Sequence, residues 1–384
     1  MTASPPTVLG VTGHRRTNEL EGPLQHVEGA STVAPDPSAR WPIELLGLLV
    51  GVPVTIHRRD PDIVLLVGGS ALLAVYTLLW CRLYHLPLVT RLMSDPWRLN
   101  REKLDEHRAT GRYGKFAVRS LYAWLLFVTL DRADGHLAVS AELKRRAERE
   151  TDCPADRIAV VPGPVDTAVY GSGRPDAGRE AVGLGAERVI LTVTNLSYCG
   201  KFVGACRSIR HVEPLLRSRP ELVYVVAGDG RYRSALWEFV DQQIDDPSVR
   251  ERIVLPGYVD DVADLYTMAD VFFYLSYADG YPNAVIEAQA AGLPVVANAR
   301  HGMVEQIEHG ETGLLFDDRG DTGDTIRRLL DHPSERRWLG KNAANEVATR
   351  NDPVTIGGQM ADALASIHVR ATERTAHEAV PPMT

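Results

Sequence analysis

The feature that most constrains the fold of this chain is a regular alternation of short apolar runs with longer stretches of helical periodicity. The strand-length runs of the first half are Val8–Val11, Val52–Ile56, Ile63–Val67, Leu88–Leu92, Leu137–Val139 and Ile158–Val161. Those of the second half are Val189–Val193, Leu222–Ala227, Ile253–Leu255, Val271–Tyr274 and Pro294–Ala297. Such alternation is typical of parallel sheets covered by helices. We therefore predict an α/β protein with two doubly wound, Rossmann-like units facing each other across a cleft, where substrates of such folds bind.

A segment rich in glycine and proline separates the two units. Pro162-Gly163-Pro164 interrupts the alternation, and residues 171–185 continue with Gly, Pro and charged side chains. This composition indicates an interdomain connection. The predicted domains are residues 1–163 and 164–351. A helix at about residues 352–370 is a candidate for packing back on the first domain, and a flexible tail is expected over residues 372–384.

The composition excludes several classes of protein. Of the 384 residues, 45% are hydrophobic and 24% are charged, which excludes a disordered or fibrous chain. The net charge of −8 leaves no general basic surface for nucleic acid. The four cysteines form no C-x-x-C pair, so neither a disulfide scaffold nor a structural metal is expected. The first residues show no signal-peptide pattern, and we expect a cytoplasmic protein.

One uncharged stretch, Ile63–Cys81, has nearly the length of a membrane-spanning helix. Its internal pattern favours a different structure. Ile63–Val67 is a β-branched run of strand length, Gly68-Gly69-Ser70 is a turn and helix-start signal, and apolar residues then recur at helical spacing. We therefore predict a strand, a turn and a helix here.

The most informative segment is Tyr277–Asn298, which reads YADGYPNAVIEAQAAGLPVVAN. Pro282 stands where a first helical residue is expected, Gly292 stands where a helix ends, and Pro294 opens a short buried strand. The pattern predicts a loop, a helix, a turn and a strand. The loop Asp279-Gly280-Tyr281-Pro282-Asn283 would then present backbone N–H groups at a helix N-terminus, which favours an anion such as a diphosphate.

Two acids flank this predicted anion site. Glu287 lies ~7.5 Å along the helix, about one ribose from a phosphate at its start, and a carboxylate suits the two donors of a ribose diol. Asp279 could bind hydroxyls of a sugar on the other side of the phosphates. The alternative for each residue alone is structural: Asp279 as a turn former and Glu287 as a solvated helix residue.

The same segment resembles the signature of the retaining, metal-independent glycosyltransferases of family 4, which have the two-domain GT-B fold. Their signature is an acidic residue, seven residues and then Glu, here Asp279 and Glu287, with Asp in place of the usual first Glu. The resemblance is strong over about Ala133–Asp317. Further matching motifs are Val161–Asp166, Gly228-Asp229-Gly230, Leu255–Tyr258, Tyr266–Asp270, His301–Glu305 and Gly310–Leu315.

The resemblance implies roles for these residues. Glu287 would bind the donor ribose, and Asp279 with the loop that follows it would hold the donor sugar; in this loop Gly280, Tyr281 and Asn283 have amides that can donate, and Pro282 shapes the backbone. Gly228, which follows a strand, would also lie at the donor.

The basic pair that neutralises the diphosphate in the family departs from the pattern in this chain. Asn195 replaces the usual Arg, and Lys201 takes approximately the place of the usual Lys. Lys201 would then supply the full charge, with a surface lysine as the alternative. Arg233 and Arg300 are candidates to compensate.

The acceptor half departs further from the family. Instead of a Gly-Gly loop after the first strand, it has Gly13-His14-Arg15-Arg16, in which Gly13 and Arg15 either touch the diphosphate or are solvated. In place of a His-Asp pair it has Ser94-Asp95-Pro96. Asp95 either orients an acceptor hydroxyl or the donor sugar, or is part of an Asp-Pro turn. His14, His107 and His136 are better explained as packing or surface residues than as a general base.

The helical stretch 115–130 also has two interpretations. Phe116, Tyr122 and Leu125 share one side, beside Lys115 and Arg119. This face either packs in the core or lies on a membrane surface, which would suit a lipid-linked acceptor.

These expectations together describe a glycosyltransferase of glycan or polysaccharide biosynthesis. It would move a hexose-type sugar from a nucleoside diphosphate sugar, its co-substrate, to a glycan or lipid-linked acceptor, without metal or other cofactor. Its location would be cytoplasmic, with peripheral contact to the inner face of the cell membrane as a hypothesis. The departing phosphate would take the acceptor's proton while Lys201 and the helix before Glu287 stabilise its charge. The alternatives are a sugar-nucleotide epimerase of the same architecture and a non-catalytic sugar-nucleotide-binding protein.

Overall fold

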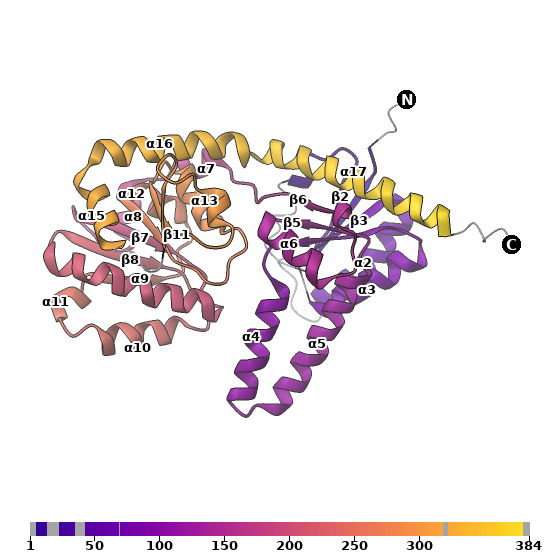
Figure 1. Cartoon of the computed structure of the whole chain (residues 1–384), viewed down its shortest axis with the longest axis horizontal. Coiled ribbons are helices and arrows are strands. Elements are labelled where there is room, and N and C mark those ends of the chain that lie inside the picture. Colours follow the sequence, from indigo (N-terminus) through magenta and orange to yellow (C-terminus); the bar gives the residue numbers. More distant parts are fainter. Residues whose placement is uncertain (1–4, 14–22, 35–42, 69, 318–321, 379–384) are drawn as a thin grey trace. The chain divides into compact units, whose positions relative to one another are not determined.

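The computed structural model describes residues 5–13, 23–34, 43–68, 70–317 and 322–378 (Figure 1). Contacts divide the chain into two compact units: Met1–Pro164 with Pro353–Thr384, called unit 1, and Val165–Asp352, called unit 2. Each unit is built around its own parallel sheet. The prediction of two doubly wound α/β units is confirmed.

The sheet of unit 1 is six-stranded within the described residues. Its strands, in spatial order, are β2 (Ser31–Val33), β1 (Val8–Thr12), β3 (Ile63–Val67), β4 (Leu88–Leu92), β5 (Gly135–Ala138) and β6 (Ile158–Val160). β1, β3 and β4 are buried at every residue, because helices cover both faces of a parallel sheet. β2 escaped prediction because three residues are too few to show a periodicity.

The helices of unit 1 follow its strands. They are α2 (Ile43–Arg59), α3 (Ala71–Leu83), α4 (Pro96–Ala109), α5 (Tyr113–Arg132), α6 (Ala141–Glu150), a short 3-10 turn (Ala155–Arg157) and α17 (Pro353–Glu378). In Figure 1, α4 and α5 form a hairpin that extends away from the sheet of this unit. The predicted strand and helix within Ile63–Cys81 are confirmed as β3 and α3, and Gly69 of the predicted turn lies outside the described residues. The Ser70 hydroxyl caps α3 by accepting from the Leu73 amide. No helix within the described ranges is long and apolar enough to cross a membrane.

The predicted strand Val52–Ile56 is wrong. These residues lie inside α2, where Leu48, Val52 and Ile56 are all buried. Their spacing of four places them on one face of a helix. A short apolar run is equally compatible with a buried helix face and a strand, and only packing distinguishes the two.

Pro53 lies within α2 and is accommodated by a neighbouring helix. Proline has no N–H to donate to the carbonyl four residues earlier, which here belongs to Leu49. The Tyr76 hydroxyl on α3 donates to that carbonyl instead. The hydrogen bond that α2 loses is therefore replaced by a tertiary contact.

The sheet of unit 2, also six-stranded in the part of the chain described, has a different strand order. It runs β12 (Leu314–Phe316), β11 (Val295–Asn298), β10 (Val271–Tyr274), β7 (Arg188–Val193), β8 (Leu222–Ala227) and β9 (Ile253–Gly257). Counted along the chain, this is the 3-2-1-4-5-6 order of dinucleotide-binding folds. The five strands predicted here are confirmed, and the three-residue β12 was not predicted.

Helices cover both faces of this second sheet (Figure 1). They are α7 (Thr167–Gly171), α8 (Pro175–Ala181), α9 (Cys199–Ser218), α10 (Arg233–Gln243), α11 (Pro247–Arg250), α12 (Val262–Met268), α13 (Asn283–Ala290), α14 (Met303–Gln306), α15 (Thr322–Asp331) and α16 (Pro333–Arg350).

The C-terminal helix α17 belongs to unit 1. Four of its residues are buried in the same core as β1, β3 and β5, namely Ile356, Met360, Leu364 and Ile367. A Cβ on Gly135 of β5 would lie 2.6 Å from Ile367, so glycine there allows the helix to approach closely. α17 continues to Glu378, past position 372 where a tail was expected, because Ala, Glu, Arg and His sustain the helix and the next proline is Pro381.

Candidate functional site

The candidate site begins at the point where the strand order of unit 2 reverses. β7 and β10 are hydrogen-bonded neighbours, but the chain leaves β7 toward β8 on one side and β10 toward β11 on the other. The loops beyond their carboxyl ends therefore diverge, and ligands of open α/β sheets bind at such switch points. Asn195 lies just after β7, and Asp279 follows β10. The sheet topology thus brings these two predicted residues to one edge of unit 2.

Two glycines allow α9 to approach the segment after β10. A Cβ on Gly200 would lie 2.8 Å from the Ala278 Cβ, and one on Gly204 would lie 2.1 Å from the Leu275 carbonyl oxygen. Glycine at both positions lets the first turns of α9 lie directly against residues 275–278. This close packing carries Lys201 to the start of the predicted donor loop.

Asp279 and Lys201 form an ion pair. The Lys201 Nζ lies 2.8 Å from Asp279 Oδ1, and both side chains are largely buried, with 16% and 11% of their areas exposed. The hydroxyl of Tyr274, the last residue of β10, donates to Asp279 Oδ2 at 2.7 Å. The carboxylate is therefore held from two sides.

The charges of this pair stabilise each other. Burial alone would raise the pKa of Asp279, but the Lys201 ammonium and hydrogen bonds from Lys201, Ser276 and Tyr274 hold it below its usual value. Burial likewise opposes the charge of Lys201, but Asp279 outweighs it and raises the pKa of the ammonium. Both groups are ionised at neutral pH, so the site offers a fixed cation beside a fixed anion.

The predicted loop, helix, turn and strand are confirmed. Pro282 is the N-cap residue of α13, and Gly292 adopts φ +71° after its last turn. The Gly292 amide donates to the Gln289 carbonyl and the Leu293 amide to the Ala288 carbonyl, which closes the helix end.

The loop before α13 is anchored in the core of unit 2. Tyr281 is buried, and its hydroxyl accepts from the Asn351 side-chain amide at 3.1 Å. The Pro282 carbonyl accepts from the Gln306 side chain at 3.0 Å. A Cβ on Gly302 would lie 2.0 Å from the Gly280 carbonyl oxygen, so glycine is required there. Tyr281 and Pro282 thus fix the direction of the helix axis, while Asn283 begins its first turn.

Glu287 is held in place by tyrosines. The Tyr266 hydroxyl donates to Glu287 Oε2 at 2.8 Å. Tyr170 on α7 lies edge-on to Tyr266, with ring centroids 5.9 Å apart. Burial, the charge of Glu287 and a hydrogen bond to it raise the pKa of Tyr170. Glu287 is therefore positioned by its neighbours, unlike the freely solvated helix residue of the alternative interpretation.

Asn195 and Gly228 have clear structural roles. The Asn195 Oδ1 accepts from the Ser197 amide at 2.9 Å, which closes a turn after β7, and a hydrogen bond from Asn195 to the donor stays a prediction. Gly228 has φ +143°, and a Cβ there would lie 1.8 Å from the Thr194 carbonyl oxygen. Its own amide donates to the Gly257 carbonyl at 2.8 Å. Gly228 therefore allows the loops after β7 and β8 to meet, and a contact with the donor stays a prediction.

Three arginine side chains add positive charge near these loops. Arg233 is the first residue of α10, and its guanidinium lies against Gly257, where a Cβ would be 2.7 Å from Arg233 Cζ. Arg300 lies over the Tyr277 ring at 5.4 Å, and Arg207 lies over the same ring at 5.0 Å.

The remaining predicted residues belong to unit 1. Asp95 is the N-cap of α4: Oδ1 accepts from the Arg98 amide at 2.8 Å, and Pro96 occupies the first turn. The structural alternative for Asp95 was an Asp-Pro turn, and the structure shows a helix cap in its place; a role toward the acceptor stays a prediction. Gly13 directly follows β1. Arg15 and His14 lie outside the described residues.

His136 fits its interpretation as a packing residue, and two aspartates of unit 2 lie at the starts of helices. His136 is fully buried on β5 beside Thr90, 2.7 Å from its hydroxyl, and burial lowers the pKa of the imidazole to about 4. Asp246 and Asp261 occupy N-cap positions of α11 and α12. Among the residues that the structure describes, His, Cys, Asp and Glu side chains form no group of three or more that could hold a metal ion.

The tyrosines that hold the two acids were not predicted from the sequence. Tyr274, Tyr266 and Tyr170 belong to apolar runs, and their rings are core residues or pack against the core. The one available signal was that a buried tyrosine hydroxyl needs a hydrogen-bond partner, which makes each buried Tyr near a predicted acid a candidate.

Family profiles match both units of the chain. The profile described as "Glycosyltransferase Family 4" matches residues 7–169, and the one described as "Glycosyl transferases group 1" matches residues 187–332. These two matches include every predicted site residue.

Individual relatives match over part of their length. The D-inositol 3-phosphate glycosyltransferase of Mycolicibacterium smegmatis is 29% identical over 223 residues, which cover 56% of this chain and 48% of that protein. The corresponding enzyme of Acidothermus cellulolyticus is 31% identical over 232 residues, which cover 58% and 51%. The matches therefore span about half the length of these relatives.

Solved structures match the fold over nearly the whole chain. Anabaena HepE in complex with UDP and glucose has a TM-score of 0.71 at 18% identity, covering 94% of this chain and 100% of that chain. Sucrose-phosphate synthase of Thermosynechococcus elongatus has a TM-score of 0.68 at 16% identity, covering 97% and 100%. At these identities the likeness concerns the fold, and it confirms the expected GT-B class with two Rossmann-like domains.

Proposed function

Since the chain belongs to the group 1 glycosyl transferases of family 4, we propose that it moves a hexose-type sugar from a nucleoside diphosphate sugar to a glycan or lipid-linked acceptor. The observation that carries this proposal is the pair of acids beyond the switch point of unit 2. Asp279 precedes α13 and is paired with Lys201, and Glu287 lies within α13 and is held by Tyr266. A diphosphate at the start of α13 would have one acid on either side, each suited to the hydroxyls of one sugar.

The donor class is supported by the chemistry of these residues. Glu287 accepts hydrogen bonds and suits the ribose diol, while Lys201 and the N-terminus of α13 suit the diphosphate. The HepE structure was solved with UDP and glucose, which is the same class of ligand. We assign the second phosphate-facing cation to Arg233, because its guanidinium lies against Gly257, whose carbonyl accepts from the Gly228 amide.

The proposed reaction retains the anomeric configuration and needs neither metal nor cofactor. The bond between the anomeric carbon and the diphosphate oxygen breaks, and a bond to the acceptor oxygen forms on the same face. The acceptor's proton passes to the departing phosphate oxygen. Lys201, charged because Asp279 raises its pKa, and the dipole of α13 stabilise the negative charge that develops on the leaving group.

Asp279 has two tasks in this proposal. It holds the Lys201 ammonium in a single position, since the two atoms lie 2.8 Å apart in a largely buried site. It also offers a carboxylate to the hydroxyls of the donor sugar. Tyr274 restricts the carboxylate further, because its hydroxyl occupies Oδ2.

The acceptor side is proposed for unit 1, with Asp95 as the candidate residue toward the acceptor and Gly13 and Arg15 toward the diphosphate. A cytoplasmic location is part of the same proposal.

A donor-binding experiment tests the site. We expect thermal-shift measurements with a panel of nucleoside diphosphate sugars to identify one stabilising donor. In Glu287→Ala the loss of charged hydrogen bonds should cost ~1–3 kcal/mol, or roughly 5- to 150-fold in donor Kd. Glu238→Ala, an exposed glutamate on α10, is the matched control and should leave the Kd unchanged.

Two results would contradict the proposal. Unchanged donor affinity in Glu287→Ala would remove the ribose assignment. Conversion of the donor to an epimer without acceptor, followed by chromatography of the nucleotide sugars, would indicate the epimerase instead.

A further inference from the structure

Two neighbouring helices of unit 1 leave rows of large apolar side chains in solvent. α3 exposes Leu72, Leu79 and Leu83, and α5 exposes Val118, Leu121 and Trp124, each between 57% and 71% exposed. The two helices pack against each other, and the Arg82 side chain of α3 donates to the Arg132 carbonyl at the end of α5 at 2.5 Å. We call these six residues the apolar face. Contiguous exposed apolar residues of this kind mark an interaction surface.

The apolar face follows the helical period. On α3 its members are seven and four residues apart, and on α5 they are three residues apart, so each set lies along one side of its helix. The opposite sides hold buried residues, such as Leu73 and Leu78 on α3 and Ala123 and Leu130 on α5. Each helix is therefore apolar both toward the core and toward solvent.

The charged residues of the two helices themselves are basic up to Asp131. α3 contains no acidic residue, and α5 contains none before Asp131, whereas Arg82, Lys115 and Arg119 are basic. The chain as a whole has a net charge of −8, so this surface is opposite in sign to the average. Basic residues beside exposed Trp and Leu are the combination that binds the interface of an anionic bilayer.

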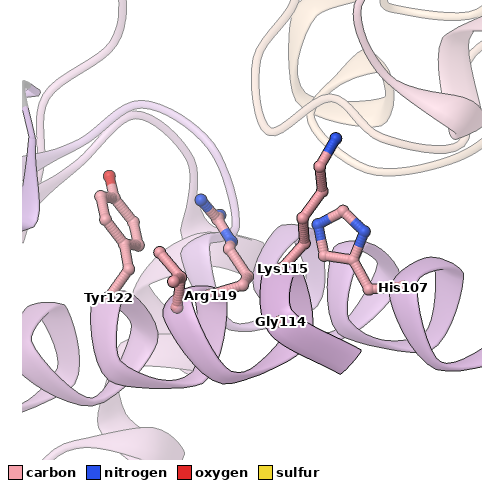
Figure 2. A pocket seen from close by; sticks show the side chains of 6 residues that line it. His107, Gly114, Lys115, Arg119 and Tyr122 are labelled. Atoms are coloured by element: carbon pink, nitrogen blue, oxygen red, sulfur yellow. The ribbon is translucent and has the colours of Figure 1, made fainter. Parts of the chain in front are cut away.

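A cationic pocket adjoins the apolar face on the α4–α5 hairpin. It has a volume of about 350 Å³ and is lined by His107, Gly114, Lys115, Val118, Arg119 and Tyr122. Figure 2 shows the side chains of His107, Lys115, Arg119 and Tyr122 pointing to the same side of the helix pair. Val118 belongs both to this pocket and to the apolar face, which makes the two surfaces continuous. A pocket lined by two cations suits an anionic headgroup such as a lipid phosphate.

We propose that α3 and α5 dock on the surface of an anionic lipid bilayer, with the apolar face in the interface and the cationic pocket on the headgroup phosphates. The occupant is a membrane surface, since no described helix can cross one. A second copy of the chain fits less well, because pairing through this face would bring the basic residues of α3 and α5 in one copy toward those of the other. The docking itself does not depend on the proposed function. Its biological role does, since docking would bring the enzyme to a lipid-linked acceptor.

Vesicle co-sedimentation tests the proposal directly. We expect the protein to pellet at low salt with vesicles of phosphatidylcholine and phosphatidylglycerol, but far less with phosphatidylcholine alone. Leu121→Ser/Trp124→Ser should lower the partition coefficient roughly tenfold or more, because two large side chains leave the interface. Lys115→Gln should lower it about fivefold, and added salt should reduce this difference.

The matched control lies in unit 2. Trp237→Ser removes an exposed tryptophan on α10, 47% exposed against 61% for Trp124, and should leave vesicle binding unchanged. Circular dichroism and melting temperature check that each variant is folded. Failure of the wild-type chain to pellet with anionic vesicles, or equal losses in the unit 1 and unit 2 variants, would overturn the proposal. A lipid-free dimer that Trp124→Ser dissociates would assign the face to a second copy instead.

The two proposals fail independently. Vesicle binding is measured without nucleotide sugar, and donor binding is measured without lipid. A variant that loses vesicle binding but keeps its donor-induced thermal shift would separate the membrane surface from the donor site.

Discussion

The two units have the same kind of scaffold but use it differently. Each has a six-stranded parallel sheet in its described part, with a switch point between β1 and β3 in unit 1 and between β7 and β10 in unit 2. In unit 2 the residues beyond that point are ionised and hydrogen-bonded, as in the pair of Asp279 and Lys201. In unit 1 the predicted acid Asp95 caps a helix, and the outer helices expose apolar residues. The fold alone therefore does not decide function; loops and outer faces do.

The comparison predicts that catalysis depends most on the ion pair of unit 2. Asp279→Asn keeps the shape of the side chain but leaves the buried Lys201 without its counter-charge. We expect kcat/KM to fall about 100- to 1,000-fold, the range for loss of one charge-stabilising group. Steady-state kinetics with the donor identified by thermal shift measure this. Activity within a few-fold of wild type would show that the pair is only structural.

The two units should also respond differently to acid. Burial lowers the pKa of His136 from 6.5 to about 4, so below pH 6.5 the unfolded chain binds a proton that the folded unit 1 does not. The stability of unit 1 should therefore fall as the pH drops from about 6.5 to 4, by about 3 kcal/mol in total. The pKa of Asp279 is lowered from 3.8, so its contribution in unit 2 is present above that value and is lost only as the pH falls below it.

Hydrogen exchange, corrected for the pH dependence of the intrinsic rate, measures the two units separately. Amides of β4 and β5 should lose protection between pH 6.5 and 4, while those of β7 and β8 change less. His136→Gln, which cannot take up a proton, should remove the pH-dependent part of the loss. Equal losses in both units would contradict the assignment to His136.

A third prediction concerns the packing that brings Lys201 to Asp279. In Gly204→Ala the new Cβ would lie 2.1 Å from the Leu275 carbonyl oxygen, so α9 must shift. We expect unit 2 to lose ~1–3 kcal/mol of stability, the usual cost of overpacking. The matched control is Gly358→Ala on α17 in unit 1, where nothing lies within 4 Å. Gly358→Ala should raise the free energy of unfolding of unit 1 by up to ~1 kcal/mol, because alanine favours a helix more than glycine does. Urea unfolding of both variants measures the two changes.

The smallest expected effect on stability is that of a substitution at Asp95, which tests whether this residue contacts the acceptor. Asparagine caps a helix about as well as aspartate, so Asp95→Asn should change the free energy of unfolding by less than about 0.5 kcal/mol. A large rise in the KM for the acceptor at unchanged stability would support a role of Asp95 beyond its cap. Unchanged kinetics would leave Asp95 with structural roles only, as the cap of α4 and the partner of Arg146 at 3.6 Å.

Much of the fold was predictable because it depends on local pattern. Buried parallel strands such as Leu222–Ala227 are continuous apolar runs, and the glycine and proline signals at Pro282 and Gly292 mark the ends of α13. The predicted strand at Val52–Ile56 was wrong, because this apolar run contributes to the buried face of α2. A run of five residues is compatible with both structures, and packing against the sheet decides between them.

The sequence by itself determined the class of the fold, the loop and helix around Asp279 and Glu287, and the residue types that suit a diphosphate and a ribose. Only the tertiary structure decided that Lys201 reaches Asp279, that Tyr266 and Tyr274 hold the two acids, and that Leu121 and Trp124 face solvent. The reason is physical: periodicity and turn signals act between neighbours in the chain. The partner of a buried charge, and the cover over an apolar side chain, depend instead on which distant segments the sheet brings together.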